Sequence, residues 1–194
     1  GSTFKKVYYD VPLGRAVSKF VPADELIVPY TATSIEDAEA VIHTVKISEN
    51  ELRKQQVAGF YRDVELGPPG NVERNELEKK ERELDGTKKS GKNEPVYTLL
   101  ECHVNLDLEG FEEVGADGQP TGIKLPYIVT VEEGSRVVLS IRRNYAPNDL
   151  KKNKIQYFVH FKFLPGLGFY GFGLIHMIGG LSRTATSALR QLLD

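Results

Sequence analysis

The 194-residue sequence lacks the features that mark several classes of protein. Its single cysteine, Cys102, excludes an intrachain disulfide and a multi-cysteine metal site, and it favours a reducing, intracellular setting. No apolar run reaches the ~18–20 residues that a membrane helix needs, and no signal peptide is apparent. Basic residues are not in excess, because 25 Lys and Arg face 27 Asp and Glu. Sequence-independent DNA binding usually requires such an excess, so tight binding of DNA is not expected.

What is present suits a folded domain. Hydrophobic residues make up 40% of the chain, enough for a substantial core, and charged residues make up an ordinary 27%. Both ends suggest a piece of a longer protein. Residues 1–2 are typical of an expression scar, and residues 184–194 have a helical pattern without the glycine or proline that commonly ends a helix. Residues 3–64 are assigned to the N-terminal α/β part of one domain.

Aromatic and β-branched residues predict a hairpin at the start of the chain. Its strands cover residues 4–9 and 16–21, and they are joined by a turn at 11–14. An extended piece at 25–30, a helical turn near 36–39 and a strand at 40–47 follow. Ser48 and Glu51 then fit the capping-box pattern, in which each side chain hydrogen-bonds the other residue's amide. This pattern predicts a helix from Glu49 to Gly59 or Phe60.

Residues 65–95 differ in kind from their surroundings. They combine glycine- and proline-rich shoulders with a dense run of charge, and the pairs Glu76/Lys80 and Glu78/Arg82 have the i,i+4 order that supports a solvated helix. Few apolar side chains are available to offset the entropy of ordering this segment. We expect a mobile, dispensable surface excursion.

Residues 96–194 complete the same domain. Apolar and polar residues alternate with a period of two, which predicts strands at 97–108, 123–131, 136–144 and 155–163. Leu100, Cys102 and Val104 are expected to face inward, and His103 to lie on a solvated polar face. The short connections predict an antiparallel meander of about four strands. With the hairpin and a C-terminal helix over 172–194, kinked near Gly179-Gly180, the fold class is α+β.

Residues 166–171 spell the pattern G-x-G-x-x-G between a strand and a helix, which is found in dinucleotide sites. The expected parallel strand and its acidic residue do not follow, so we interpret these glycines as a close-packed bend. His103 could pair with a neighbouring Glu101, but no third ligand has metal-like spacing. No nucleophile and base occur in a recognisable setting. We predict no catalytic residue, no metal site and no cofactor. The basic clusters at 142–143 and 151–154 could face an acidic partner or nucleic acid, and they stay a weaker candidate for a functional patch.

Three segments resemble portal proteins of tailed bacteriophages and prophages, particularly those of short-tailed phages. They are SENELRKQQVAGFYRDVEL at 48–66, VPYTATSIEDA at 28–38 and FVHFKFLPGLGFYGFGLIH at 158–176. The resemblance implies a structural, non-enzymatic virion component at the capsid vertex, formed in the host cytoplasm. It implies a ring, usually of twelve copies, that admits and ejects double-stranded DNA without binding it specifically. It also implies docking of terminase and tail-adaptor proteins, and it places this chain in the wing region.

The C-terminal segment has more apolar side chains than one side of a small sheet needs. Such a surplus is typical of an interface, so we predict contacts between subunits or a continuation into the stem. The alternative is a core helix packed over the meander. The candidate interface residues are Phe169, Tyr170, Phe172, Ile175, Ile178 and Leu181. Two other functions stay open: a nucleotide-binding enzyme domain that uses residues 166–171, and a generic phage adaptor or interaction module.

Overall fold

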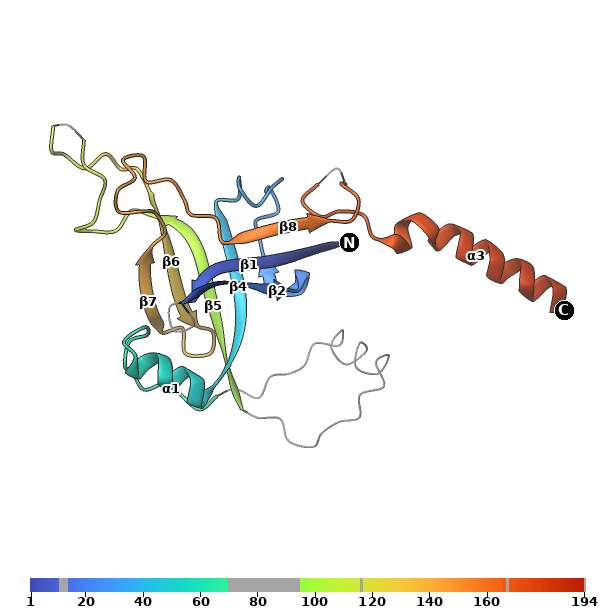
Figure 1. The fold of residues 1–194 in the computed structure, drawn as a ribbon, viewed down its shortest axis with the longest axis horizontal. Coiled ribbons are helices and arrows are strands. Elements are labelled where there is room, and N and C mark those ends of the chain that lie inside the picture. The colour runs from blue at the N-terminus through green and yellow to red at the C-terminus, as the bar shows by residue number, and fades with distance from the viewer. Residues whose placement is uncertain (11–13, 70–94, 116, 167, 194) are drawn as a thin grey trace. The chain divides into compact units, whose positions relative to one another are not determined.

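The computed structural model describes residues 1–10, 14–69, 95–115, 117–166 and 168–193 (Figure 1). Most of the predicted excursion at 65–95 therefore lies outside the described residues. The chain forms two compact units, one of residues 1–41 and 153–194 and one of residues 42–152. The main elements are β1 (Ser2–Asp10), β2 (Arg15–Val21), a 3-10 helix (Ala23–Glu25), β3 (Leu26–Ile27), β4 (Ala40–Ser48), α1 (Glu49–Val57), β5 (Val96–Leu106), β6 (Leu125–Glu132), β7 (Val138–Arg143), β8 (Phe158–Lys162) and α3 (Leu174–Leu193).

The first unit contains a three-stranded antiparallel sheet in the order β2-β1-β8. The predicted hairpin is confirmed, and its register places Phe4 opposite Val21. On the other side of β1, Phe4 lies opposite His160 of β8. Phe4 is fully buried. It belongs to a core formed by side chains of the three strands, of the segment that follows β2 and of the loop that follows β8. The core residues are Phe4, Val21, Leu26, Ile35, Ala38, Val41, Phe158 and Phe169.

The position of β8 corrects one sequence-based expectation. The spacing of strands predicted β8 as the fourth strand of the meander, next to β7. Instead β8 pairs with β1 in the other sheet. A two-stranded hairpin is marginally stable alone, and a third strand allows it to bury one face. The connection from β7 to β8, residues 144–157, is also too long to act as a tight turn that would enforce pairing.

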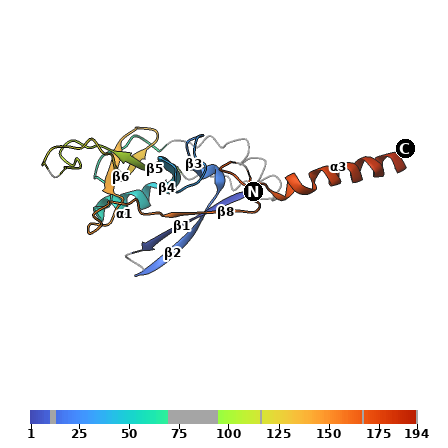
Figure 2. The same ribbon diagram turned by 90° about the horizontal axis from the view of Figure 1, so that it is seen from above.

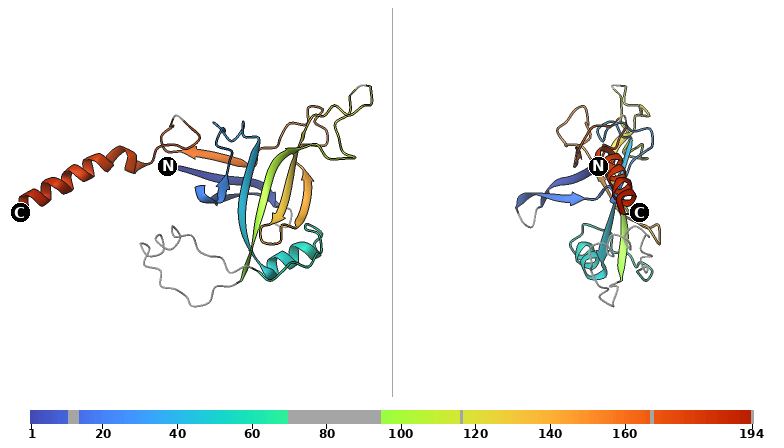
Figure 3. Two further views of the ribbon diagram at one scale, coloured as in Figure 1. Left: turned by 180° about the vertical axis from the view of Figure 1, so that it is seen from behind. Right: turned by 90° about the vertical axis from the view of Figure 1, so that its right-hand side faces the viewer.

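The second sheet has five strands in the order β3-β4-β5-β6-β7. Strands β5, β6 and β7 lie side by side as an antiparallel meander, as predicted (Figure 3). The described residues form two antiparallel sheets and two α-helices, which confirms the α+β class. The core of the unit that contains residues 42–152 includes Leu52, Tyr97, Leu99 and Leu139.

Helix α1 begins where the sequence predicts it. The Ser48 hydroxyl accepts a hydrogen bond from the Glu51 amide at 3.3 Å. The Glu51 carboxylate does not complete the box, because it accepts from Lys54 and Gln55 instead. The helix ends at Val57, earlier than predicted, and Gly59 adopts a φ of 74° that glycine tolerates best.

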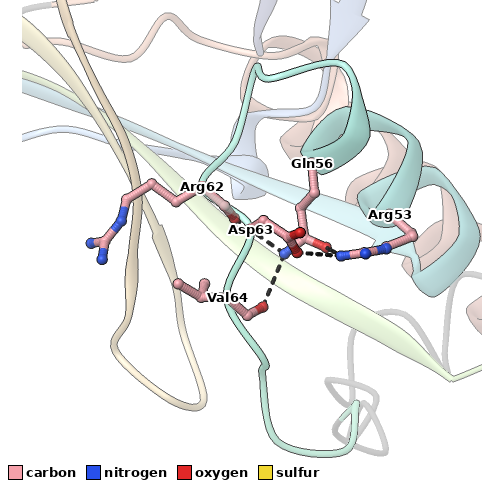
Figure 4. A network of polar contacts seen from close by, with 5 residues as sticks. All are labelled: Arg53, Gln56, Arg62, Asp63 and Val64. Atoms are coloured by element: carbon pink, nitrogen blue, oxygen red, sulfur yellow. Dashed lines mark hydrogen bonds and ion pairs between the residues drawn. The ribbon is translucent and has the colours of Figure 1, made fainter.

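The segment after α1 is held back against the helix by one buried amide (Figure 4). Gln56, 8% exposed, donates from Nε2 to the carbonyls of Arg62 at 3.2 Å and Val64 at 3.0 Å. Arg53 donates to the Gln56 side chain and pairs with Asp63. Gln56 therefore satisfies two carbonyl groups that its removal would leave without this donor.

Strand β5 buries the face that the sequence predicted to be exposed to solvent. The structure buries Tyr97, Leu99 and His103, which is only 5% exposed, whereas Leu100 and Cys102 on the opposite face are half-buried. The expected solvated face at His103 is therefore wrong. Burial is possible because the Glu101 carboxylate lies 2.7 Å from the His103 ring and compensates for lost hydration.

Candidate subunit interface

The loop between β8 and α3 is a close-packed bend that only glycine permits. A Cβ at Gly166 would lie 2.8 Å from the Tyr170 carbonyl oxygen, and one at Gly171 would lie 2.6 Å from the Leu164 carbonyl oxygen. The Phe172 amide donates to that same Leu164 carbonyl at 2.8 Å. The glycines therefore serve backbone contact within the protein, in agreement with their interpretation as a bend.

Amides at the end of this loop donate to acceptors within the protein. Gly171 donates to the Ser2 hydroxyl at 2.8 Å, and Gly173 donates to Nδ1 of His176 at 3.2 Å. In a dinucleotide site such amides face the pyrophosphate instead. Strand β8, which precedes the loop, is also part of an antiparallel sheet rather than the parallel sheet of a dinucleotide fold. The loop does not have the geometry of a phosphate cradle.

Phe169 is a core residue at the base of the candidate interface. It is 8% exposed, and its ring lies 6.0 Å from that of Phe4 and 4.8 Å from the ring of His160. Burial, together with the nearby Lys162 ammonium, lowers the pKa of His160. Tyr170 and Phe172 follow at the surface, half exposed. The aromatic segment thus has one anchor in the core and two rings available for contact.

Helix α3 runs unbroken from Leu174 to Leu193, so the predicted kink at Gly179-Gly180 is not observed. Isolated glycines weaken a helix by only ~1 kcal/mol each, and good helix formers surround these two. The hydroxyls of Thr184 and Thr186 donate to carbonyls one turn back, at 3.1 and 2.8 Å. None of the 20 residues of this helix is buried.

One side of α3 carries a continuous apolar seam. Its residues are spaced alternately by four and three, which is the a/d pattern of helices that pack along their length. The members are Leu174, Ile178, Leu181, Ala185, Ala188 and Leu192. On the opposite side, His176, Arg183 and Arg190 repeat at intervals of seven. The helix is therefore amphipathic, like a helix that packs in a bundle with others.

The exposure of the seam is large for a protein surface. Leu181 is 73% exposed and Leu192 is 81% exposed, and Ile175 at the flank is 75% exposed. Burying a side chain of this type stabilises by ~1.5–3 kcal/mol. An isolated helix of this length is marginal in water without packing of its apolar face. A partner surface would therefore stabilise α3 substantially.

The structure brings most of the predicted interface residues together. Five of the six, all except Phe169, are exposed on α3 or on the loop that leads into it. The sequence-based list stopped at Leu181 and missed the second half of the seam. The alternating four- and three-residue spacing through Ala185, Ala188 and Leu192 was the signal that could have extended it.

Other candidate chemistry is sparse in the part of the chain that the structure describes. Glu101 and His103 form a buried pair, but no group of three or more His, Cys, Asp or Glu residues there could hold a metal ion. Burial raises the pKa of the Cys102 thiol, and Glu101 raises it further. No helix among the described residues is long and apolar enough to cross a membrane.

Comparison with known proteins identifies a family. A family model described as "Phage SU10 portal protein" matches residues 6–194, which is nearly the whole chain. No curated protein matches the chain.

Proposed function

The chain belongs to the phage SU10 portal protein family, and on this premise we propose that it is a structural subunit of a portal ring. In this proposal DNA enters and leaves the capsid through the ring without sequence-specific contact. Terminase docks on the ring during packaging, and tail-adaptor proteins dock on it later. The subunit is a virion component that assembles in the host cytoplasm, the ring holds twelve copies, and this chain supplies part of the wing.

The observation that carries the proposal is the family match over residues 6–194. The α3 seam supports the oligomeric part of it. A head-to-tail contact repeated around an axis closes into a ring when its rotation divides the circle evenly. An exposed seam with a/d spacing suits packing against the equivalent helix of a neighbouring copy. The functional role is architectural in this proposal, and the protein needs neither a nucleophile nor a cofactor.

The seam can be tested by a single charge. In the full-length protein, Ile178→Asp places a carboxylate in the middle of the seam, and Ser187→Asp places the same group on the polar side of α3. Burying an unpaired charge is strongly unfavourable, so the first variant should lose rings and the second should keep them. Negative-stain electron microscopy measures ring formation, and circular dichroism measures folding.

The two variants also separate the alternatives. Because no residue of α3 is buried within the subunit, the Ile178→Asp subunit should keep its folded β-sheets, and it should lose only the helix content and stability that contacts between subunits add. Rings of normal diameter in Ile178→Asp would overturn the role of the seam. A subunit that unfolds would show instead that α3 belongs to the core, which was the competing expectation.

A further inference from the structure

The three-stranded sheet of the first unit is apolar on both faces. Successive residues of a strand point to opposite faces, and residues directly opposite each other on neighbouring strands share a face. The register therefore places Lys5, Phe20 and Val159 together on the face opposite to the core residue Phe4, which we call the outer face. Its large apolar side chains, each 40% to 64% exposed, are Val7, Tyr9, Phe20, Val159, Phe161 and Phe163.

The outer face has the wrong composition for a face that stays in water. Antiparallel sheets with a solvated face normally turn their polar residues outward. Strand β8 does the reverse, because Val159 and Phe161 lie on the outer face, whereas His160 and Lys162 share the face of buried Phe158. At about 150–250 Å² for one aromatic side chain, the six apolar side chains expose roughly 500 Å². A patch of this size commonly marks an interaction site.

The charge of the outer face restricts the kind of partner. Lys5 is the one charged residue among those that the strand pairing places on this face. Its ammonium group lies 5.5 Å from the centre of the Phe161 ring. Two copies packed through identical outer faces would bring two such ammonium groups together, and like charges across an interface are strongly unfavourable. An apolar surface without basic residues is therefore the better partner.

Helix α3 has such a surface beside its seam. Ile175, Ser182 and Leu189 repeat at intervals of seven, so they form a flank along one side of the helix. Ile175 and Leu189 are both exposed. An apolar stripe that includes such a flank is wider than the seam of a coiled coil. The flank therefore remains available when the seam packs against another helix.

The two surfaces also match in size. Helix α3 has 20 residues and strand β1 has nine, so each is about 30 Å long. Three strands span about 10 Å across, which is close to the diameter of a helix. Beyond Lys6 the hairpin of β1 and β2 continues without β8, and it carries Val7 and Tyr9 onward (Figure 2). A helix laid along the strands can thus cover most of the outer face.

We propose that the outer face of the β2-β1-β8 sheet binds the flank of α3 from a neighbouring copy of the chain. This inference rests on the proposed function, because a ring requires a repeated contact between two different surfaces of the subunit. In this contact Ile175 and Leu189 pack against the exposed aromatic rings. The Ser182 hydroxyl lies between them on the flank and accepts a hydrogen bond from the Lys5 ammonium group.

Photochemical crosslinking tests which segment lies on the outer face. In the full-length protein, the photoreactive residue p-benzoylphenylalanine replaces Phe161, and in a control it replaces Phe111, an exposed ring of the other unit. After irradiation, the first protein should give a product of twice the subunit mass, with the crosslink in residues 174–193. The control should give no crosslink to that segment. A crosslink to α3 within one subunit, or none to α3, would overturn the proposal.

A matched pair of substitutions tests the strength of the contact. Val159→Lys adds a second ammonium group beside Lys5, and Ile141→Lys makes the same change at an exposed β-branched residue of strand β7. Mass photometry gives the midpoint concentration of assembly. Loss of one buried aliphatic contact should raise this midpoint at least about tenfold for Val159→Lys. The control should change it less than about twofold.

The outcomes separate this contact from the portal assignment. Equal midpoints for Val159→Lys and Ile141→Lys would overturn the proposal. Rings seen by electron microscopy in both variants would at the same time leave the proposed function intact. The crosslink from position 161 is measured in a chain with Val159 unchanged, so it decides the question even if Val159→Lys does not fold.

Discussion

The turn between β6 and β7 depends on one buried carboxylate, that of Glu132, which is 7% exposed. Its Oε1 accepts from the Gly134 amide at 3.0 Å. Its Oε2 accepts from both the amide and the hydroxyl of Ser135, each at 2.6 Å. Burial by itself raises the pKa of Glu132, but the hydrogen bonds from Ser135 and Gly134 outweigh it and lower the pKa below its usual value.

Glu132→Gln keeps the shape of the side chain and removes its charge. The amide can keep its oxygen toward Ser135, so two hydrogen bonds persist in neutral form, and the Gly134 amide then faces an NH2 group. Hydrogen bonds to a charged group contribute ~1.5–3 kcal/mol and neutral ones ~0.5–1.5 kcal/mol. After the smaller desolvation penalty of the neutral amide is included, we expect destabilisation of about 3 kcal/mol at pH 7. Glu133→Gln, an exposed neighbour, should change stability by less than ~0.5 kcal/mol.

Urea unfolding followed by circular dichroism measures both variants against the wild type. The folded-state pKa of Glu132 is lowered, so its carboxylate contributes stability above the unfolded pKa of about 4.5, and this is lost as pH falls through the folded pKa. The difference between wild type and Glu132→Gln should therefore shrink in acid. A difference under ~0.5 kcal/mol at pH 7, or one independent of pH, would refute the reasoning.

Two further predictions concern buried polar groups. Gln56→Leu leaves the Arg62 and Val64 carbonyls without their donor and should destabilise the protein by about 2 kcal/mol, whereas Gln55→Leu should have a smaller effect. Faster hydrogen exchange at residues 60–66 would accompany the loss, and unchanged exchange would contradict it. Burial, with Lys162 nearby, lowers the pKa of His160, so the folded state favours the neutral ring and stability falls as pH drops from ~6.5 through the folded pKa. An NMR titration that places the His160 pKa at or above ~6.5 would refute this.

Local signals predicted the elements whose causes are local. The Ser48 hydroxyl starts α1 because the cap needs only residues 48–51. The hairpin of β1 and β2 follows from two adjacent β-prone runs and a turn, and the β5–β6–β7 meander follows from strands joined by loops that favour pairing between sequence neighbours. The glycine bend at 166–171 was also correctly interpreted, because the sequence around it did not fit a dinucleotide fold.

Predictions failed where distant segments compete. Nothing in the alternation of β8 distinguishes β7 from β1 as its partner, since both offer an antiparallel edge. The inward face of β5 was misassigned because Glu101 and His103 are polar by type yet contact each other at 2.7 Å when buried. For the candidate interface, Phe169 was grouped with its exposed neighbours because sequence alone does not place its ring beside Phe4 and His160.

The sequence alone thus determined the α+β class, the hairpin, the start of α1 and the apolar excess of the C-terminal segment. These depend on backbone propensity, capping and periodicity, which act over a few residues. Only the tertiary structure decided that β8 joins β1, that Phe169 is core, and that the seam of α3 lies exposed. Each of these depends on which apolar surfaces pack together from segments that are far apart in the sequence. Because hydrophobic burial is non-directional, the local pattern of residues does not specify the partner.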